Sequence, residues 1–206
     1  MGRQELLPVA ALVIYVVYLI AAFGVRSWLH YRATGDTGMR GVSGRVGSPE
    51  WLAGILFVVA VLVGIAGPVA GLLGLAPIGL LDHLEVAAAG LAWALAGVVY
   101  TVVAQRDMGA SWRVGVDDSE TTDLVTGGLF RWSRNPIFTA MMMAATGLAL
   151  IVPNVVSLVG LVALIAAIHL QVQVVEEPYL LREHGQDYRS YAARVGRFLP
   201  WFGRLR

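Results

Sequence analysis

The feature that most constrains this fold is the length of its charge-free stretches. Leu6–Val25 and Val86–Gln105 each run for 20 residues without Asp, Glu, Lys or Arg, and the stretches 51–81 and 135–175 run for 31 and 41 residues. A helix needs about 20 apolar residues to cross the hydrocarbon core of a bilayer. The chain is 57% hydrophobic and 14% charged, which leaves too few polar residues to cover a water-facing surface. The sequence therefore predicts an all-α integral membrane protein.

The two longest stretches each contain a helix-breaking signal. Pro68 is expected to kink a helix over residues 51–75, because proline removes a backbone hydrogen bond. Pro153–Asn154 is a turn signal that divides the last stretch into two helices, Pro136–Val152 and Val155–Val175. The prediction is about five transmembrane helices, with the fourth and fifth forming a tight hairpin.

The first apolar stretch has a rival interpretation as a cleaved signal peptide. Its 20 apolar residues are long for that role, and the next loop carries four arginines that resemble a stop-transfer signal, Arg26, Arg32, Arg40 and Arg45. A retained helix is the interpretation favoured here.

The arginines predict the orientation of the five spans. All fifteen basic residues are arginine, and five spans put fourteen of them on one side and only Arg3 on the other. The positive-inside rule then places the N-terminus outside and the C-terminus in the cytoplasm. The arginine, alanine, glycine and valine bias suggests a GC-rich bacterial genome, and the expected location is the bacterial cytoplasmic membrane.

Two helices carry stripes of small residues that favour close helix packing in lipid. They are Gly64, Gly67, Gly71 and Gly74 in the second span, and Gly90, Ala94 and Gly97 in the third.

The loop before the fourth helix combines arginines with a helix start. Pro136 suits the first helical turn, and Asn135 or Ser133 could cap it. The free N–H groups of that turn, with Arg131 and Arg134 close by, form a candidate site for a carboxylate or phosphate. The alternative is that both arginines are ordinary membrane anchors.

A second polar group lies at the inner end of the fifth helix. His169, Gln173 and Glu176 or Glu177 follow at helical spacings of three to four, and so share a face. A carboxylate there could accept both hydroxyls of a ribose or hold a cation. Glu177 is expected nearer a ligand, because it follows His169 and Gln173 at intervals of four. Alternatively, His169 is a hydrogen-bonded packing residue.

The C-terminal tail predicts an amphipathic helix at the cytoplasmic membrane surface. Tyr188, Tyr191 and Val195 repeat at i, i+3 and i+7, with arginines on other faces. This helix is either a membrane anchor or a lid over the two polar groups.

Several kinds of site are excluded or disfavoured by the sequence. Cysteine is absent, which excludes thiolate metal sites and a cysteine nucleophile. No Gly-x-Gly-x-x-Gly motif follows a strand, no residue cluster has metal-ligand spacing, and the basic residues suit lipid headgroups better than nucleic acid. No line of charges runs through the spans, which disfavours a transporter. Gly41, Gly44 and Gly47 are interpreted as a flexible loop.

Between Met108 and Pro200 the chain resembles the isoprenylcysteine carboxyl methyltransferases, membrane enzymes related to phospholipid methyltransferases. The motifs that carry the resemblance are Met-Gly-Ala-Ser-Trp at 108–112, Thr-Gly-Gly-Leu-Phe-Arg at 126–131, Arg-Asn-Pro-Ile-Phe at 134–138, Glu176-Glu177, Gly185, Tyr188, Tyr191, and Arg-Phe-Leu-Pro at 197–200. The chain departs from the family pattern at Asn135, where His is most familiar, and at Phe130 and Phe138, where tyrosines stand. These departures affect the substrate end more than the cofactor end.

The resemblance implies a methyltransferase that uses S-adenosylmethionine and no metal. It implies one membrane domain, 1–206, with a three-helix part at 1–105 and a cofactor-binding and catalytic part at 106–206. The implied cofactor-binding residues are Thr126, Gly128, Arg131, Arg134, Asn135, Pro136, Glu177, Tyr188, Tyr191, Leu199 and Pro200, and the implied catalytic residues are Arg134, Glu176 and His169.

The expected acceptor is lipophilic, either prenylated or lipid-like, and carboxyl or other O-methylation is the favoured reaction. The alternatives are N- or S-methylation of a phospholipid or small molecule, and a non-catalytic membrane protein that does not bind S-adenosylmethionine at all.

Overall fold

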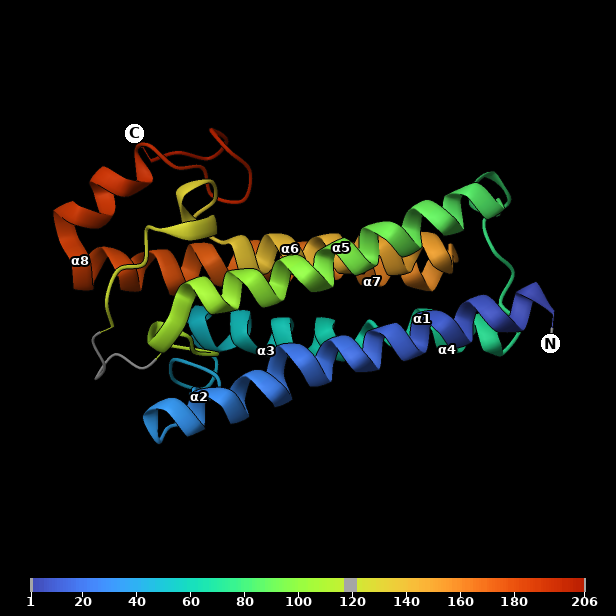
Figure 1. The fold of residues 1–206 in the computed structure, drawn as a ribbon, viewed down its shortest axis with the longest axis horizontal. Coiled ribbons are helices and arrows are strands. Elements are labelled where there is room, and N and C mark those ends of the chain that lie inside the picture. Colours follow the sequence, from blue (N-terminus) through green and yellow to red (C-terminus); the bar gives the residue numbers. More distant parts are fainter. Residues whose placement is uncertain (1, 117–121, 206) are drawn as a thin grey trace.

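Apolar helices run along the long axis of the molecule (Figure 1). The computed structural model describes residues 2–116 and 122–205. Within this part of the chain, four helical segments are long and apolar enough to cross a membrane, namely Glu5–Thr34, Pro49–Leu72, Leu84–Ser111 and Val155–Ala192. A shorter apolar helix, Pro136–Ile151, precedes the last of these. In chain order Pro136–Ile151 is therefore the fourth segment and Val155–Ala192 the fifth. These segments correspond to the five predicted spans, and the protein is an all-helical integral membrane protein.

The first segment extends beyond its predicted end. Helix α1 (Arg3–Leu19) continues through a π-turn, η1 (Ile20–Val25), into α2 (Arg26–Thr34), which ends at Gly35 in the left-handed conformation. Arg26 and Arg32, expected in the following loop, therefore lie on the helix. No proline lies between residues 9 and 34, so the backbone hydrogen bonds continue until Gly35, in the left-handed conformation, ends the helix.

The second segment is interrupted just before Pro68, the residue predicted to kink it. Helix α3 (Pro49–Val63) stops at Gly64, and α4 (Ala66–Leu72) starts two residues later. Pro68 has no N–H for the carbonyl of Gly64, four residues earlier, and its ring crowds that carbonyl. The kink at Pro68 is confirmed. A short 3-10 helix, η2 (Gly79–Leu81), follows before the third segment begins.

The third and fourth segments pack closely through small residues. Helix α5 (Leu84–Met108), followed by the 3-10 turn η3 (Gly109–Ser111), lies against α6 (Pro136–Ile151). A Cβ atom added to Gly97 would lie 2.5 Å from the Ala144 nitrogen, and one added to Gly90 would lie 2.7 Å from the Gly147 carbonyl oxygen. The predicted packing role of the stripe is confirmed, because backbones in contact leave no room for larger side chains.

The glycines of the second segment also make helix contacts. Gly64 lies against Tyr15, Gly67 against Ser157, and Gly71 against Val152. The stripe thus brings α4 against both the first and the last segment. Gly74, the last glycine predicted in the stripe, has no atom within 4 Å of its Cβ position.

The fourth and fifth segments form the predicted hairpin. Helix α7 (Val155–Gln171) is capped by Asn154, whose side chain accepts a hydrogen bond of 2.9 Å from the Ser157 nitrogen. The Asn154 amide also donates to the Gly67 carbonyl at 2.9 Å. This buried asparagine therefore ends the turn and ties the hairpin to α4.

The amphipathic helix predicted at the end of the chain is continuous with the helix that precedes it. Helix α7 continues through a π-turn, η5 (Val172–Glu176), into α8 (Glu177–Ala192), which bends at Gly185. Tyr188 and Tyr191 are 1% and 4% exposed, so they face the interior rather than lipid headgroups. The tail after α8 folds back over the bundle (Figure 1).

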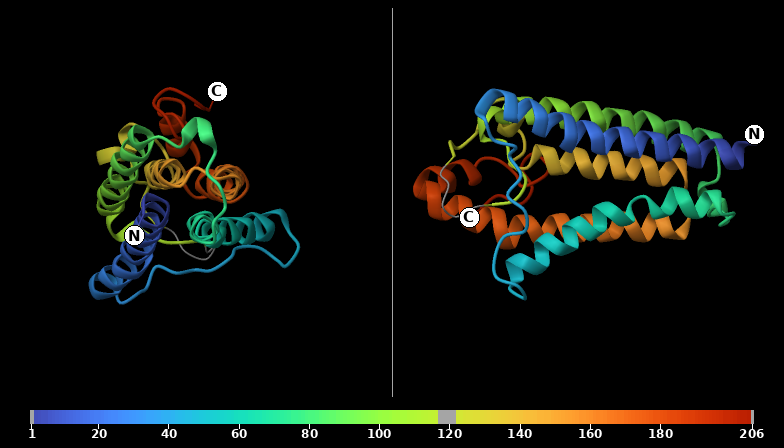
Figure 2. Two further views of the ribbon diagram at one scale, coloured as in Figure 1. Left: turned by 90° about the vertical axis from the view of Figure 1, so that its right-hand side faces the viewer. Right: turned by 90° about the horizontal axis from the view of Figure 1, so that it is seen from below.

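The two ends of the chain lie at opposite ends of the bundle (Figure 1). The arginine-bearing loops and the C-terminal tail gather at one end, and the short turns before α5 and α7 lie at the other (Figures 1 and 2). This arrangement agrees with an odd number of spans.

Candidate functional site

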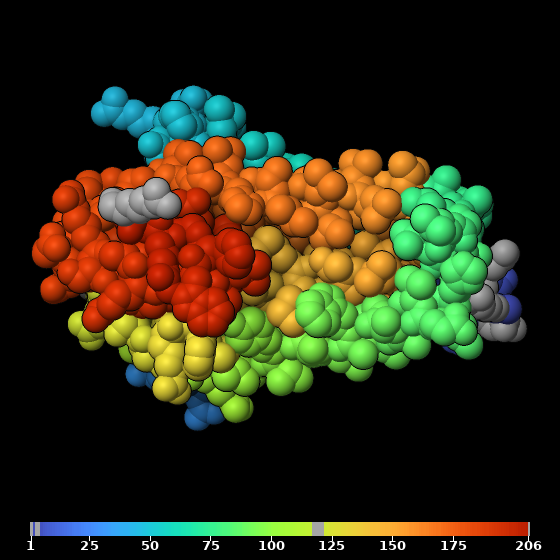
Figure 3. Space-filling view, turned by 90° about the horizontal axis from the view of Figure 1, so that it is seen from above, coloured from blue at the N-terminus to red at the C-terminus, as the bar shows by residue number. Residues whose placement is uncertain are grey.

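The turn that precedes α6 is held by the C-terminal tail. Ser133 and Gly196 form an isolated parallel bridge. The Arg134 nitrogen donates to the Gly196 carbonyl at 2.9 Å, and both the backbone and side-chain nitrogens of Asn135 donate to the Arg197 carbonyl, at 3.1 and 3.0 Å. In Figure 3 the tail (red) lies against the segment before α6 (yellow). The Asn135 side chain, one of the two predicted caps, does not cap α6, because the tail engages it.

A buried ion cluster ties this turn to α8. The Glu177 carboxylate, in a residue that is only 6% exposed, accepts hydrogen bonds of 2.8 Å from Arg134 Nη2 and from Arg197 Nε and Nη2. The hydrogen bonds from Arg197 to this carboxylate raise the pKa of the guanidinium. Charge-assisted hydrogen bonds of this kind are the strong ones in proteins. The cluster therefore fixes the start of α6, the start of α8 and the tail relative to one another.

Arg134 keeps hydrogen-bonding capacity for a ligand. Its Nη2 donates to Glu177 and to the Gly203 carbonyl. Its Nε and Nη1 are buried and have no hydrogen-bond partner within residues 2–116 and 122–205. Its guanidinium carbon lies 5.9 Å from the ring centroid of Tyr188. Buried donors are normally satisfied, so this side chain indicates a place for an anion.

Arg134 faces a cavity of about 580 Å³. That volume is in the range of small-molecule and cofactor sites. One end of the cavity is polar, and its lining includes Arg134, Asn135, Glu176, Tyr188 and Tyr191. The other end is apolar, and its lining includes Phe23, Phe57, Val61, Phe138 and Met141. A molecule with a charged part and a hydrocarbon part matches both ends.

The π-turn η5 decides which polar side chains reach the cavity. Residues five apart are separated by roughly 140° on an α-helix, but a π-turn bonds residue i to i+5 and brings such residues to one side. Gln171 and Glu176 both line the cavity as a result. Gln171 is 7% exposed, and its Oε1 has no hydrogen-bond partner among the described residues. Gln173, selected by α-helical spacing, is exposed.

The sequence and the fold of this chain are both similar to those of known methyltransferases. Residues 86–187, from α5 into α8, match the family model described as phospholipid methyltransferase. The whole chain superposes on the structure of the eukaryotic intramembrane Ras methyltransferase, isoprenylcysteine carboxyl methyltransferase, with a TM-score of 0.67. The sequences are 18% identical, and the match covers 100% of this chain and 70% of that one. No curated protein sequence matches the chain.

The chain is a membrane methyltransferase with the fold of isoprenylcysteine carboxyl methyltransferase. The resemblance predicted from its motifs is confirmed. At this identity the structural likeness shows the shared fold, and the family match adds the methyltransferase activity.

The methyltransferase fold brings six of the predicted site residues to the cavity. They are Arg134, Asn135, Pro136, Glu176, Tyr188 and Tyr191. Glu177 lies behind this lining in the ion cluster, so Glu176 rather than Glu177 is the glutamate that reaches the cavity. The roles of these residues in cofactor binding and catalysis stay predictions.

The other predicted site residues lie outside the cavity lining. His169 is exposed on α7, with its ring centroid 4.7 Å from that of Phe198. Thr126 is exposed in the loop before the short 3-10 helix η4 (Gly128–Arg131), and Gly128 and Arg131 are exposed at the two ends of that helix. Leu199 is 57% exposed in the tail, and Pro200 follows it.

Sequence reasoning missed several residues of the lining. Tyr179 lines the cavity, and Arg113, also in the lining, lies with its guanidinium carbon 4.7 Å from the Tyr179 ring centroid. Gln171 was missed because α-helical spacing was assumed through η5. A glutamine in an apolar helix is itself a signal, since an unpaired amide is costly away from water. Among the described residues no group of three His, Cys, Asp or Glu is placed to hold a metal ion.

Proposed function

We propose that this methyltransferase uses S-adenosylmethionine to methylate a lipophilic acceptor, prenylated or lipid-like, at the cytoplasmic face of the membrane. The observation that carries the proposal is a single cavity with a polar end at Arg134 and an apolar end among the membrane helices. Transfer to a carboxylate or another oxygen is the favoured reaction.

The polar end fits the proposed cofactor. S-adenosylmethionine supplies an electrophilic methyl group on a sulfonium and carries an amino-acid carboxylate and a ribose diol. The unpartnered Nε and Nη1 of Arg134 are donors for a carboxylate. Glu176 offers acceptor oxygens for hydroxyl groups, and Tyr188 and Tyr191 offer aromatic faces, which attract cations.

The apolar end supports a hydrocarbon-bearing acceptor. Phe57, Val58 and Leu62 of α3 line it, and Val58 and Leu62 are 44% and 62% exposed. A hydrocarbon chain buried along such a wall gains about 0.8 kcal/mol per CH₂ group. The protein contributes to the reaction mainly by aligning the two molecules. A carboxylate acceptor needs no base at neutral pH.

N-methylation of a phospholipid headgroup is the second candidate. Glu176 and Gln171 place a carboxylate and an amide oxygen on the same side of the cavity. Such acceptors suit an ammonium or amine better than a carboxylate, which they would repel. The match of residues 86–187 to the phospholipid methyltransferase model agrees with this candidate.

We also propose the orientation that the arginines predict. The N-terminus would lie outside and the arginine-rich end in the cytoplasm of a bacterial cell, where S-adenosylmethionine is made. The cavity lies at the arginine-bearing end of the bundle, since Arg113 and Arg134 line it.

Binding and turnover test the proposal with a matched pair of arginine variants. S-adenosylhomocysteine should bind the wild-type protein in nanodiscs, as measured by calorimetry. Arg134→Lys keeps a cation beside Glu177 but loses the planar fork of donors, so affinity should fall about ten- to a hundredfold. Arg131→Lys, on the exposed side of the same loop, should bind as wild type does.

The acceptor is identified by transfer of a labelled methyl group to membrane lipid extracts, to a prenylated cysteine peptide and to phosphatidylethanolamine. A wild-type protein that binds no S-adenosylhomocysteine contradicts the proposal and favours a non-catalytic membrane protein.

A further inference from the structure

One glycine-rich segment lies beside the cavity and has no role in the site described above. We name residues 35–48, which join α2 to α3, the strap. Its five glycines, Gly35, Gly38, Gly41, Gly44 and Gly47, recur every third residue and all have φ between 72° and 85°. Only glycine adopts this conformation readily. The five glycines therefore allow the strap a defined backbone conformation with positive φ angles, in addition to any flexibility.

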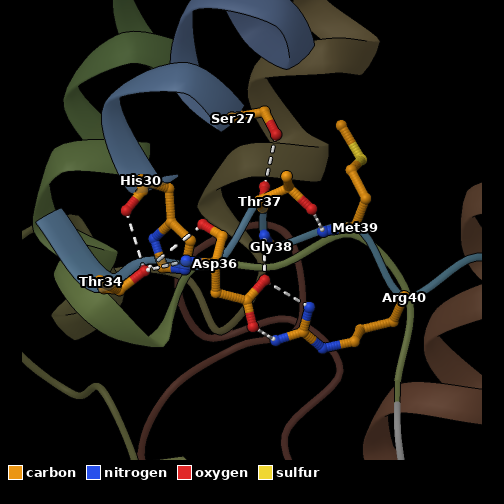
Figure 4. Close-up of polar contacts among 8 residues, drawn as sticks. All are labelled: Ser27, His30, Thr34, Asp36, Thr37, Gly38, Met39 and Arg40. Carbon is orange, nitrogen blue, oxygen red and sulfur yellow. Dashed lines mark hydrogen bonds and ion pairs between the residues drawn. The ribbon is translucent and has the colours of Figure 1, made fainter. Parts of the chain in front are cut away.

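The start of the strap is pinned to α2 by polar contacts (Figure 4). The Asp36 carboxylate accepts from the Gly38 nitrogen at 2.8 Å and from both terminal nitrogens of Arg40, at 2.7 and 2.5 Å. The hydrogen bonds from Arg40 and Gly38 lower the pKa of Asp36 to about 2. Ser27 of α2 donates to the Thr37 carbonyl. This end of the strap is fixed.

The middle of the strap pairs with residues 112–116. The Arg40 nitrogen donates to the Val114 carbonyl at 2.9 Å, and the Val114 nitrogen donates to the Gly38 carbonyl at 2.7 Å. Further along, Ser43 Oγ donates to the Val116 carbonyl at 2.7 Å and accepts from the Val116 nitrogen at 3.1 Å. These few hydrogen bonds hold the two segments edge to edge.

Two glycines of the paired segments, Gly41 and Gly115, lie against each other. Gly115 has a φ of 87°, and a Cβ atom added to it would collide with the Gly41 carbonyl oxygen. No side chain fits between the backbones there, so that contact lacks the interlocking packing that holds helices together.

The paired segments form one wall of the cavity. Met39, Gly41 and Val42 of the strap line it, as do Val114, Gly115 and Val116 opposite. Figure 2 shows the strap crossing from α2 to α3 at one end of the bundle. Since the strap carries Arg40 and Arg45, this wall belongs to the arginine-rich end, which faces water. The remaining walls are mostly helices with apolar outer faces.

We propose that the strap and residues 112–116 form a cover that parts between Gly41 and Gly115 to admit water-soluble ligand and closes over it. The nature of that ligand, S-adenosylmethionine, rests on the proposed function. Closure keeps water from the polar end of the cavity, where it would weaken the contacts of Arg134 and Glu176. Opening breaks only the hydrogen bonds between the paired segments, while Asp36 and Trp112 stay fixed. Trp112 is 2% exposed and packs against His30 and Arg26 of α2.

The cover is tested by a labelling experiment that needs no cofactor. The chain has no cysteine, so Gln171→Cys creates a single thiol in the buried lining, and a charged, membrane-impermeant thiol reagent reports access from water. Gly115→Ala in this background blocks closure against Gly41. Gly47→Ala is the matched control, because Gly47 has nearly the same φ, 85°, but nothing within 4 Å of its Cβ position.

Gly115→Ala should be labelled about tenfold faster than the control, which corresponds to a loss of about 1.4 kcal/mol from the closed state. Gly47→Ala should be labelled at the rate of the protein with Gln171→Cys alone. Equal labelling rates for the two alanine variants contradict the proposed cover.

A second variant keeps the test decisive if Gly115→Ala does not fold. Met39 and Val114 are paired across the bridge and both line the cavity, so Met39→Cys with Val114→Cys can be joined by oxidation. The oxidised protein should release prebound S-adenosylhomocysteine at least about tenfold more slowly than the reduced protein. Unchanged release contradicts the role of the cover in exchange. Failure of the wild type to bind this ligand contradicts only the proposed function, and the labelling rates still decide whether the cover opens.

Discussion

The two adjacent glutamates should respond differently to the same substitution. Glu177 accepts three hydrogen bonds of 2.8 Å from Arg134 and Arg197 in a buried cluster. Glu176 lies outside this cluster and lines the cavity. Replacing either by Gln removes a carboxyl group and keeps the size of the side chain. Only the position in the structure distinguishes the two variants.

The expected loss of stability in Glu177→Gln follows from the two arginines that lose their carboxylate partner. The Arg134 side chain is 1% exposed and that of Arg197 is 22% exposed, so water cannot replace the lost carboxylate fully. Removing one partner of a buried ion pair costs about 3–5 kcal/mol. For a chain of this length that corresponds to a fall in Tm of roughly 6–20 °C. The tail, which the cluster holds, should also become sensitive to trypsin at Arg197.

Glu176→Gln should leave the fold intact and change the site. Its Tm should stay within about 2–4 °C of wild type, while S-adenosylhomocysteine affinity or turnover falls, because a neutral amide accepts hydroxyl donors less strongly than a carboxylate. Scanning fluorimetry and calorimetry on both purified variants provide the two measurements. A Glu177→Gln protein as stable as wild type, or equal losses of stability in both variants, would refute the assignment.

Further predictions concern the bundle and its orientation. Gly147→Ala should lower the Tm, because its Cβ would collide with the backbone of α5. Gly160→Ala, whose Cβ would have its nearest neighbour at 3.9 Å, should leave the free energy of unfolding unchanged or raise it by roughly 0.5–1 kcal/mol. Scanning fluorimetry on the two variants checks this. Asn154→Ala should cost about 1–3 kcal/mol, since it leaves the Gly67 carbonyl and a helix end unsatisfied in the buried turn, measured by the same method. Reporter fusions after Pro77 should be active outside the cell and those after Arg45 in the cytoplasm; the opposite pattern would invert the proposed orientation.

The helices and their breaks could be predicted from the sequence because their causes are local. Twenty uncharged residues form a helix in lipid whatever surrounds them, and Pro68 interrupts its own helix through the carbonyl four residues earlier. The turn at Asn154 and the glycine stripe of α5 are local in the same way. The resemblance to methyltransferases could also be predicted from the sequence, because the motifs between Met108 and Pro200 are recognised by their order along the chain and not by their contacts.

The site required the tertiary structure because its geometry depends on residues far apart in the chain. The sequence placed a helix face through His169, Gln173 and Glu177, but the π-turn η5 instead presents Gln171 and Glu176 to the cavity. A π-turn leaves no reliable mark in residue spacing, since it is stabilised by what the helix packs against. The sequence alone therefore determined which segments enter the membrane, and only the tertiary contacts decided which of two neighbouring glutamates faces the cavity and which one holds the tail.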